Sequence, residues 1–178
     1  MKGHGLLVEA AAILERRGGL AGVRIAIVGD AVQGQERLRV QLLEQVDNAG
    51  LSDRFALLPF CDDIWPVWFG TQIAVVPSTE PESFGLVAIE AMAAGVPVVA
   101  AAHGGLLDIV RDGETGLLFE PRSASALADA LGRLIGDAPL RARLGEAGAR
   151  RQADAFSLAS QQRQTESLYR EMVRAGRP

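Results

Sequence analysis

The chain has 178 residues, of which 48 % are hydrophobic, and its formal net charge is −4 at pH 7. A chain of this length can bury one well-formed core but is short for two domains. The acidic balance argues against a nucleic-acid partner, because proteins that bind nucleic acids usually present a basic face.

The first half of the chain alternates helices and strands. A first helix, which ends at Gly18-Gly19, is predicted by apolar residues at helical spacing: Leu6, Leu7, Ala10, Ala11 and Leu14. The run 23–29 predicts a buried strand, and a second helix follows at about 35–48 with an apolar face of Leu38, Leu42, Leu43 and Val46. A strand at 55–60 comes next, then a short helix that Asp62-Asp63 can cap, and a strand at 73–78.

The second half continues the alternation and indicates the fold class. A helix at about 84–94 stops at Gly95 and Pro97, and strands are expected at 96–102 and 116–120. Helices at about 123–136, 139–153 and 158–175 complete the chain. Because the strands are continuously apolar, they indicate a parallel sheet covered by helices on both faces. The sequence therefore predicts an α/β, doubly wound, Rossmann-like domain over residues 1–178, with a ligand beyond the carboxyl ends of the strands.

The stretch PESFGLVAIEAMAAG at 81–95 carries two glutamates, Glu82 and Glu90, on either side of an apolar run. Ser83 is the expected N-cap of the helix that follows, and the first N–H groups of that helix can bind phosphate or sugar hydroxyls. Gly85 lets a ligand approach the backbone closely. A carboxylate can accept two hydroxyl hydrogen bonds at once, as a vicinal diol requires.

Both glutamates also have a simpler interpretation. Glu82 can interact with the helix dipole, and Glu90 can be a surface residue; charge alone gives these alternatives about equal weight with a ligand site. The neighbours of Glu90 between Leu86 and Ala93 are apolar and leave little solvent face. A glutamate buried there is costly without a partner, so the pattern favours a ligand for Glu90.

Other polar residues predict no second kind of catalytic site. His103 can touch a ligand at a strand end or be an ordinary loop residue, and His4 is the only other histidine. No metal cluster with the usual ligand spacing is therefore expected. Ser78 and Ser83 have no histidine nearby in the sequence, so a hydrolase triad has no support.

Cysteine content and charge distribution bear on location. Cys61 is the only cysteine, so no intrachain disulfide can form, which fits a reducing cytoplasm. We expect no signal peptide and no membrane span, because no apolar stretch approaches roughly 18–20 residues. Residues 1–130 carry a net charge of −8 and residues 131–178 a net charge of +4. The basic tail is either a solvated face or a surface for an acidic partner or anionic membrane.

Several blocks in order along the chain resemble family 4 of the retaining glycosyltransferases. They are KG at 2–3, IVGD at 27–30, PS at 77–78, ESFGLVAIEAMAAGVPVVA at 82–100, GG at 104–105, DIVRDGETGLLF at 108–119, SALADALGRLI at 125–135 and FS at 156–157. Two glutamates eight positions apart are a weak pattern alone and a specific one within these blocks. The resemblance covers nearly the whole chain and implies the C-terminal, donor-binding half of the two-domain GT-B architecture.

The resemblance also implies roles for individual residues. Glu82 would hold hydroxyls of the donor sugar, and Glu90 would hold the ribose diol of the nucleotide. Lys2 would neutralise the diphosphate and help it depart, without a metal or other cofactor; its alternative is a solvated terminal charge. The remaining donor-binding positions are the backbone around Phe84, Gly85 and Leu86, which would face sugar and diphosphate, and Pro59 and Phe60, which would border the base.

By this resemblance the function is hexosyl transfer, with retained anomeric configuration, from a nucleotide-diphosphate sugar to a glycan or lipid-linked acceptor. The setting would be polysaccharide or glycoconjugate biosynthesis in the cytoplasm, with peripheral association of the full enzyme at the inner face of the membrane left open. The family's N-terminal acceptor-binding domain is not among these residues, so we expect the chain alone to be inactive.

The terminal helix carries an apolar stripe that the acceptor domain would cover, and that is otherwise open to self-association: Leu158, Leu168, Tyr169, Met172 and Val173. Two alternative functions stay open. One is a non-catalytic nucleotide-sugar-binding module that acts through a partner chain, and the other is a sugar-nucleotide epimerase.

Overall fold

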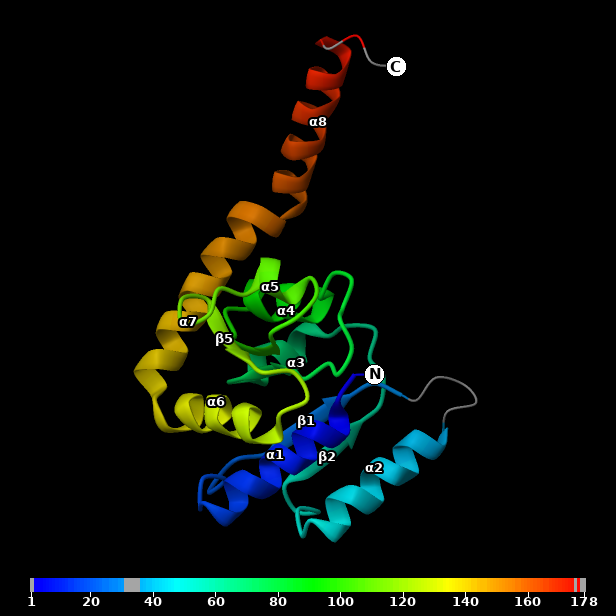
Figure 1. Ribbon diagram of the computed structural model, residues 1–178, viewed down its shortest axis with the longest axis vertical. Helices are drawn as coiled ribbons and strands as arrows, with labels where there is room; N and C mark the ends of the chain where they lie inside the picture. The colour runs from blue at the N-terminus through cyan, green and yellow to red at the C-terminus, as the bar shows by residue number, and fades with distance from the viewer. Residues whose placement is uncertain (1, 31–35, 175, 177–178) are drawn as a thin grey trace.

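The computed structural model describes residues 2–30, 36–174 and 176. Helices and strands alternate along it, and Figure 1 shows the last helix extending away from the rest of the molecule. The strands are β1 (Ile25–Val28), β2 (Phe55–Leu58), β3 (Ala74–Val76), β4 (Val98–Ala101) and β5 (Gly116–Phe119). The helices are α1 (His4–Arg16), α2 (Glu36–Asn48), α3 (Trp65–Gly70), α4 (Leu86–Ala93), α5 (Leu106–Ile109), α6 (Ala124–Gly136), α7 (Ala138–Arg151) and α8 (Leu158–Arg174), with the π-helical turn η1 (Gln152–Phe156) before α8.

The predicted elements are all present, with ends close to those expected from the sequence. Residues 35 and 175, at the ends of two predicted helices, lie outside the described residues. The helix α5 was not predicted, because four residues are too few to display a helical period. The helix expected at 139–153 continues instead as the π-helical turn that ends at Phe156.

All pairings between the strands are parallel, as predicted. The strands form two hydrogen-bonded groups, β1 with β2 and β3 with β4 and β5 in that order. Ile25 is opposite Phe55 in the first group, and Val98 lies between Ala74 and Gly116 in the second. Parallel strands have their carboxyl ends at one edge, so the loops that follow them gather there.

Helices cover both faces of the second group of strands. Val99 and Ala101 of β4 point into a core shared with α1, α2 and α6, whereas Val98 and Ala100 point into a second core formed with α4 and α5. All four residues are buried. This two-sided cover confirms the α/β, doubly wound, Rossmann-like fold class.

The first group of strands is covered less completely than its sequence predicts. Ile25 and Ile27 of β1 pack on the first core, but Ala26 between them is exposed. Leu58 of β2 is exposed as well. The strand expected to be buried at 23–29 is therefore only half-buried, at Ile25, Ile27 and Val28, and exposed at Ala26. The apolar face predicted for α2 is also partly wrong: Leu42 and Val46 are buried, and Leu38 and Leu43 are exposed.

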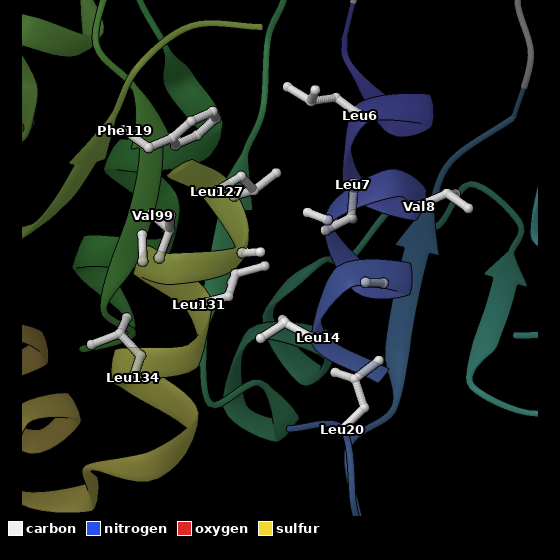
Figure 2. Packing of buried hydrophobic residues seen from close by; sticks show 14 of the residues in the cluster. Leu6, Leu7, Val8, Leu14, Leu20, Val99, Phe119, Leu127, Leu131 and Leu134 are labelled. Atoms are coloured by element: carbon white, nitrogen blue, oxygen red, sulfur yellow. The ribbon is translucent and has the colours of Figure 1, made fainter. Parts of the chain in front are cut away.

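The first core joins the two groups of strands through the packing of α1 against α6. Figure 2 shows Leu7 and Leu14 of α1 facing Leu127 and Leu131 of α6. The same core includes Ile25 and Ile27 of β1 together with Val99 of β4. Burying several leucines at about 1.5–3 kcal/mol each is enough to hold α1 in place across both groups.

The C-terminal helices differ sharply in burial. The helix α7 packs on α4, with Leu144, Gly145 and Gly148 buried. In α8 only Ser160 is buried, and the predicted stripe is exposed along its length: Leu158, Leu168, Tyr169, Met172 and Val173. Within the part of the chain that the structure describes, no helix has the length and apolar character needed to cross a membrane.

The contact between α7 and the turn after α4 gives a test of the fold. A Cβ atom at Gly145 would overlap the carbonyl oxygen of Gly95, so Gly145→Ala forces two backbones apart. We expect the free energy of unfolding to fall by about 1–3 kcal/mol in urea denaturation, as overpacking does. Gly136→Ala, at a helical glycine with no atom near its Cβ position, serves as the control and should cost nothing. Equal stability of the two variants would contradict this packing.

Candidate functional site

The candidate site lies at the carboxyl edge of the strands, where the chain leaves β3 and enters α4. This segment runs from Pro77 to Gly85 and contains Glu82, while Ser78 at its start is buried. The loop after β4 packs directly on it through two glycines. A Cβ atom at Gly104 would lie 2.5 Å from the carbonyl oxygen of Glu82, and one at Gly105 would lie 2.9 Å from that of Phe84. Glycine at both positions therefore lets the two loops touch.

Hydrogen bonds hold Glu82 in this segment from several sides. The backbone N–H of Gly105 donates to the Glu82 carbonyl at 2.8 Å. The Ser78 hydroxyl donates to Glu82 Oε1 at 2.6 Å. His103, which follows β4, contacts the Ser78 carbonyl through Nε2 at 2.9 Å, so its imidazole steadies the backbone that carries the serine.

The two residues predicted to be catalytic, Lys2 and Glu82, lie together although 80 positions separate them. Lys2 Nζ donates to Glu82 Oε1 at 2.7 Å, with the lysine side chain 70 % and the glutamate side chain 14 % exposed. Gly3 makes this possible, because it adopts φ = 75° and a Cβ atom there would overlap the Pro77 carbonyl. The amino end of α1 therefore contacts the start of the segment after β3, at Pro77, and Lys2 is the cation beside the carboxylate.

The charges around Glu82 lower its pKa. Partial burial by itself would raise the pKa, but hydrogen bonds from Lys2 and Ser78, with the charges of Lys2 and His103, outweigh that effect. The pKa of His4, the first residue of α1, is lowered too, mainly by burial and also by the charge of Lys2. Glu82 is thus a carboxylate at neutral pH, ready to accept hydrogen bonds.

The start of α4 offers unpaired backbone donors beside Glu82. Its N-cap is Gly85 at φ = 91°, a left-handed conformation that glycine adopts without strain, and no side chain caps the helix. The predicted Ser83 cap is therefore wrong. The N–H groups of Leu86 and Val87 have no backbone acceptor among the described residues. Together with the positive end of the helix dipole, they form a surface suited to an anion or to hydroxyl groups.

The environment of Glu90 differs from the expected one. Leu86 and Val87 of α4 are exposed, and Glu90 is half-buried one turn farther along that side of the helix. The expectation that its neighbours leave little solvent face is wrong, because α4 packs on the core through Ala88, Ile89, Ala91 and Met92 and leaves its other side open. Glu90 can therefore meet either solvent or a ligand that lies along this side.

Pro59 and Phe60 follow β2 at the same edge, and both are exposed. The backbone N–H of Phe60 donates to Asp30 Oδ2 at 3.1 Å, which ties the end of β2 to the end of β1. The N-cap of α3 is Ile64 and not Asp62 or Asp63 as predicted, although Asp63 accepts a hydrogen bond from the N–H of Trp65 at 3.1 Å. Within the described residues, no three His, Cys, Asp or Glu side chains come close enough to hold a metal ion.

The sequence did not predict that Ser78 would be a partner of Glu82. The sequence shows only a serine directly after an apolar strand, and this pattern is too common to identify a site residue by itself. The sequence pattern also gave no role to Arg122, which follows β5 and reaches the segment that carries Glu82.

The family described as glycosyl transferases group 1 matches residues 1–151. A protein named D-inositol 3-phosphate glycosyltransferase from Nocardia farcinica is 42 % identical over 147 residues, which are 82 % of this chain and 32 % of that protein. The chain therefore spans about a third of the length of that relative.

Solved structures of similar fold include complexes with a nucleotide sugar. Anabaena HepE in complex with UDP-glucose has a TM-score of 0.85 and 31 % identity, over 94 % of this chain and 45 % of the other. The C-terminal domain of a glycosyl transferase group 1 family protein (LpcC) from Francisella tularensis has a TM-score of 0.77 and 30 % identity. In that case the similarity covers 88 % of this chain and 80 % of the other, so a domain of this extent has been crystallised separately.

The ion pair between Lys2 and Glu82 predicts a change in titration. Lys2→Met should raise the pKa of Glu82, because it removes both a hydrogen bond and a positive charge from the carboxylate. Carbon-13 NMR of the glutamate carboxyl groups would measure this pKa. Since the pKa is lowered in the folded state, its contribution to stability is present above about pH 4 and is lost as pH falls through the folded value. That acid-linked loss should be smaller in Lys2→Met.

Arg54→Met is the matched control for this titration, since it removes a cation that pairs with Glu15 on another surface. It should leave the pKa of Glu82 as in the unsubstituted chain. An unchanged Glu82 pKa in Lys2→Met would show that the two side chains do not pair in solution.

Proposed function

The chain belongs to the glycosyl transferases group 1 family, and on that premise we propose that it is the donor-binding half of a retaining, family 4 glycosyltransferase of GT-B architecture. It would bind a nucleotide-diphosphate sugar and support hexosyl transfer to a glycan or lipid-linked acceptor. One observation carries this proposal: Lys2, Glu82 and the unpaired N–H groups at the start of α4 meet at the carboxyl edge of the strands.

The diphosphate is the part of the donor that this arrangement suits best. During transfer the bond between the anomeric carbon and the diphosphate oxygen breaks, the acceptor oxygen bonds to that carbon, and the acceptor hydroxyl releases its proton. Negative charge then grows on the departing diphosphate. Lys2 and the first N–H groups of α4 would stabilise this charge, an electrostatic role that requires no metal or other cofactor.

The carboxylates are proposed to hold the hydroxyl groups of the donor. Glu82 pairs with Lys2 in the free protein, and a diphosphate would compete for that ammonium group. Glu82 could then accept hydrogen bonds from the sugar while Ser78 keeps its carboxylate oriented. Glu90, on the open side of α4, would accept from the ribose diol, and Pro59 and Phe60 would border the base.

The identity of donor and acceptor follows from the relatives as a proposal. HepE has been crystallised with UDP-glucose, so we propose a uridine diphosphate sugar as donor. Relatives are named D-inositol 3-phosphate glycosyltransferases, which supports a hydroxylated acceptor bound by a domain beyond these 178 residues. We place the reaction in the cytoplasm, in glycoconjugate assembly. We also propose that the exposed stripe of α8 is a surface for the acceptor domain or for a second copy of this chain.

The two glutamates should lose different ligands when substituted. Glu90→Ala should weaken binding of both UDP and UDP-glucose by roughly 10- to 100-fold in calorimetry, since it removes charge-assisted bonds to a diol worth about 1.5–3 kcal/mol. Glu82→Ala should weaken binding of UDP-glucose and leave UDP affinity nearly unchanged. Glu146→Ala, which removes an exposed carboxylate on α7, is the control. Equal losses of both ligands in Glu82→Ala would contradict its assignment to the sugar.

Transfer should require more than these residues. The acceptor must be held against the anomeric carbon, and we assign that positioning to the domain beyond this chain. The purified 178 residues should therefore bind the donor and form no glycoside when incubated with radiolabelled UDP-glucose and a broad acceptor mixture. Sustained glycoside formation would overturn the half-enzyme proposal, and an epimerised sugar nucleotide would replace it with an epimerase.

A further inference from the structure

Arg122 adopts a backbone conformation that arginine ordinarily avoids. It lies between β5 and α6 in the turn Glu120–Pro121–Arg122–Ser123, which the hydrogen bond from Ser123 N to Glu120 O closes at 3.2 Å. Its φ is 64°, and it is the one non-glycine residue with positive φ in the described part of the chain. A turn with proline second and a positive φ third is of type II, and glycine is the favoured third residue. Arginine at this position therefore stores backbone strain.

The Arg122 side chain reaches across to the segment that carries Glu82. Its Nε donates to the Thr79 carbonyl at 3.0 Å, and its Nη2 donates to Glu80 Oε1 at 2.7 Å. These contacts join residues more than 40 positions apart. Thr79 and Glu80 come directly before Pro81 and Glu82, so the guanidinium binds the candidate-site segment just before Glu82.

Stability alone does not account for this arrangement. The Arg122 and Glu80 side chains are 66 % and 59 % exposed, and ion pairs that are this exposed contribute little to folding. A glycine would remove the strain of the turn without disturbing the buried core. A residue that breaks a local rule at small energetic return, beside a candidate site, points to a functional constraint.

We propose that Arg122 is a positioning residue for the donor-binding segment 79–85. It fixes the start of the segment, while the N–H of Gly105 and the Ser78 hydroxyl fix it at Glu82. Its two donors in a rigid planar fork suit a carbonyl and a carboxylate held side by side. The role of Arg122 in donor binding rests on the function proposed above. The two hydrogen bonds from Arg122 to Thr79 and Glu80, called the clamp below, exist in the free protein.

Three variants separate positioning from simple stabilisation. Arg122→Gly removes the clamp and relieves the strain of the turn. Arg122→Lys keeps one charge but not the planar fork. Arg170→Ala is the matched control, because Arg170 also pairs with a glutamate, Glu166, at 2.7 Å and with similar exposure of 71 % and 58 %. All three would be tested in the full chain by thermal melting, by amide hydrogen exchange and by calorimetry with UDP and UDP-glucose.

In Arg122→Gly, the melting temperature should stay within about 2 °C of the original or rise. Exchange of amides in 79–85 of the free protein should increase by roughly fivefold or more, the factor that one or two net hydrogen bonds give. Affinity for UDP-glucose should fall by a similar factor, with a smaller loss for UDP. Arg122→Lys should give intermediate values, and Arg170→Ala should match the unsubstituted chain in all three measurements.

Several results would overturn the proposal. Unchanged exchange in 79–85 would show that Arg122 does not hold this segment, even if affinity fell. A direct contact between Arg122 and the ligand would then explain the loss of affinity. Faster exchange throughout the chain with a lower melting temperature would make Arg122 a structural residue only. Faster exchange in 79–85 with unchanged affinity would remove its role in binding. If the unsubstituted chain binds no UDP, GDP or ADP sugar, the proposed function fails, and the exchange measurement still decides the clamp.

Discussion

The close approach of Gly3 to the Pro77 carbonyl is the constraint on which the site depends. No side chain fits between them, so the amino end of α1 rests on the backbone that leaves β3. The rest of α1 is held by its leucines, which pack against α6. This packing places the backbone of Lys2 next to the segment after β3, within reach of Glu82. Core packing thus brings the backbone of Lys2 to Glu82, and the ion pair at 2.7 Å joins the two side chains.

The segment that carries Glu82 combines close backbone contacts with exposed chemistry. Gly104 and Gly105 let the loop after β4 pack against it, and Arg122 donates a hydrogen bond to its Thr79 carbonyl. Gly85 turns the chain into α4 without a side-chain cap, which leaves the first N–H groups of the helix open to a ligand. Rigid support with unpaired donors is the combination that electrostatic stabilisation of a leaving group requires, because the donors need not reorganise during the reaction.

The strands form two groups, yet the domain coheres because one core spans both of them. Side chains from β1 and from β4 reach the same cluster, to which α1 and α6 also contribute. The cover ends there: one face of β1 and β2 and nearly all of α8 are exposed in the described residues. Burial is therefore concentrated in the two cores on either face of β4, one with α1 and α6 and the other with α4 and α5.

The sequence by itself determined the order of helices and strands and the parallel sheet, because hydrophobic period is a local signal. Its short motifs predicted Glu82, Glu90 and Lys2 as site residues, and those roles stay predictions. It misjudged the cap at Ser83 and the solvent face of Glu90, since both depend on which side of α4 meets the core. Only the tertiary structure brought Lys2 and Ser78 to the same carboxylate oxygen and placed Arg122 against Thr79. The Lys2 and Arg122 contacts join residues that are 80 and 43 positions apart, and the Ser78 contact depends on how the loop after β3 folds back. Local sequence patterns do not determine such distances, because packing between elements sets them.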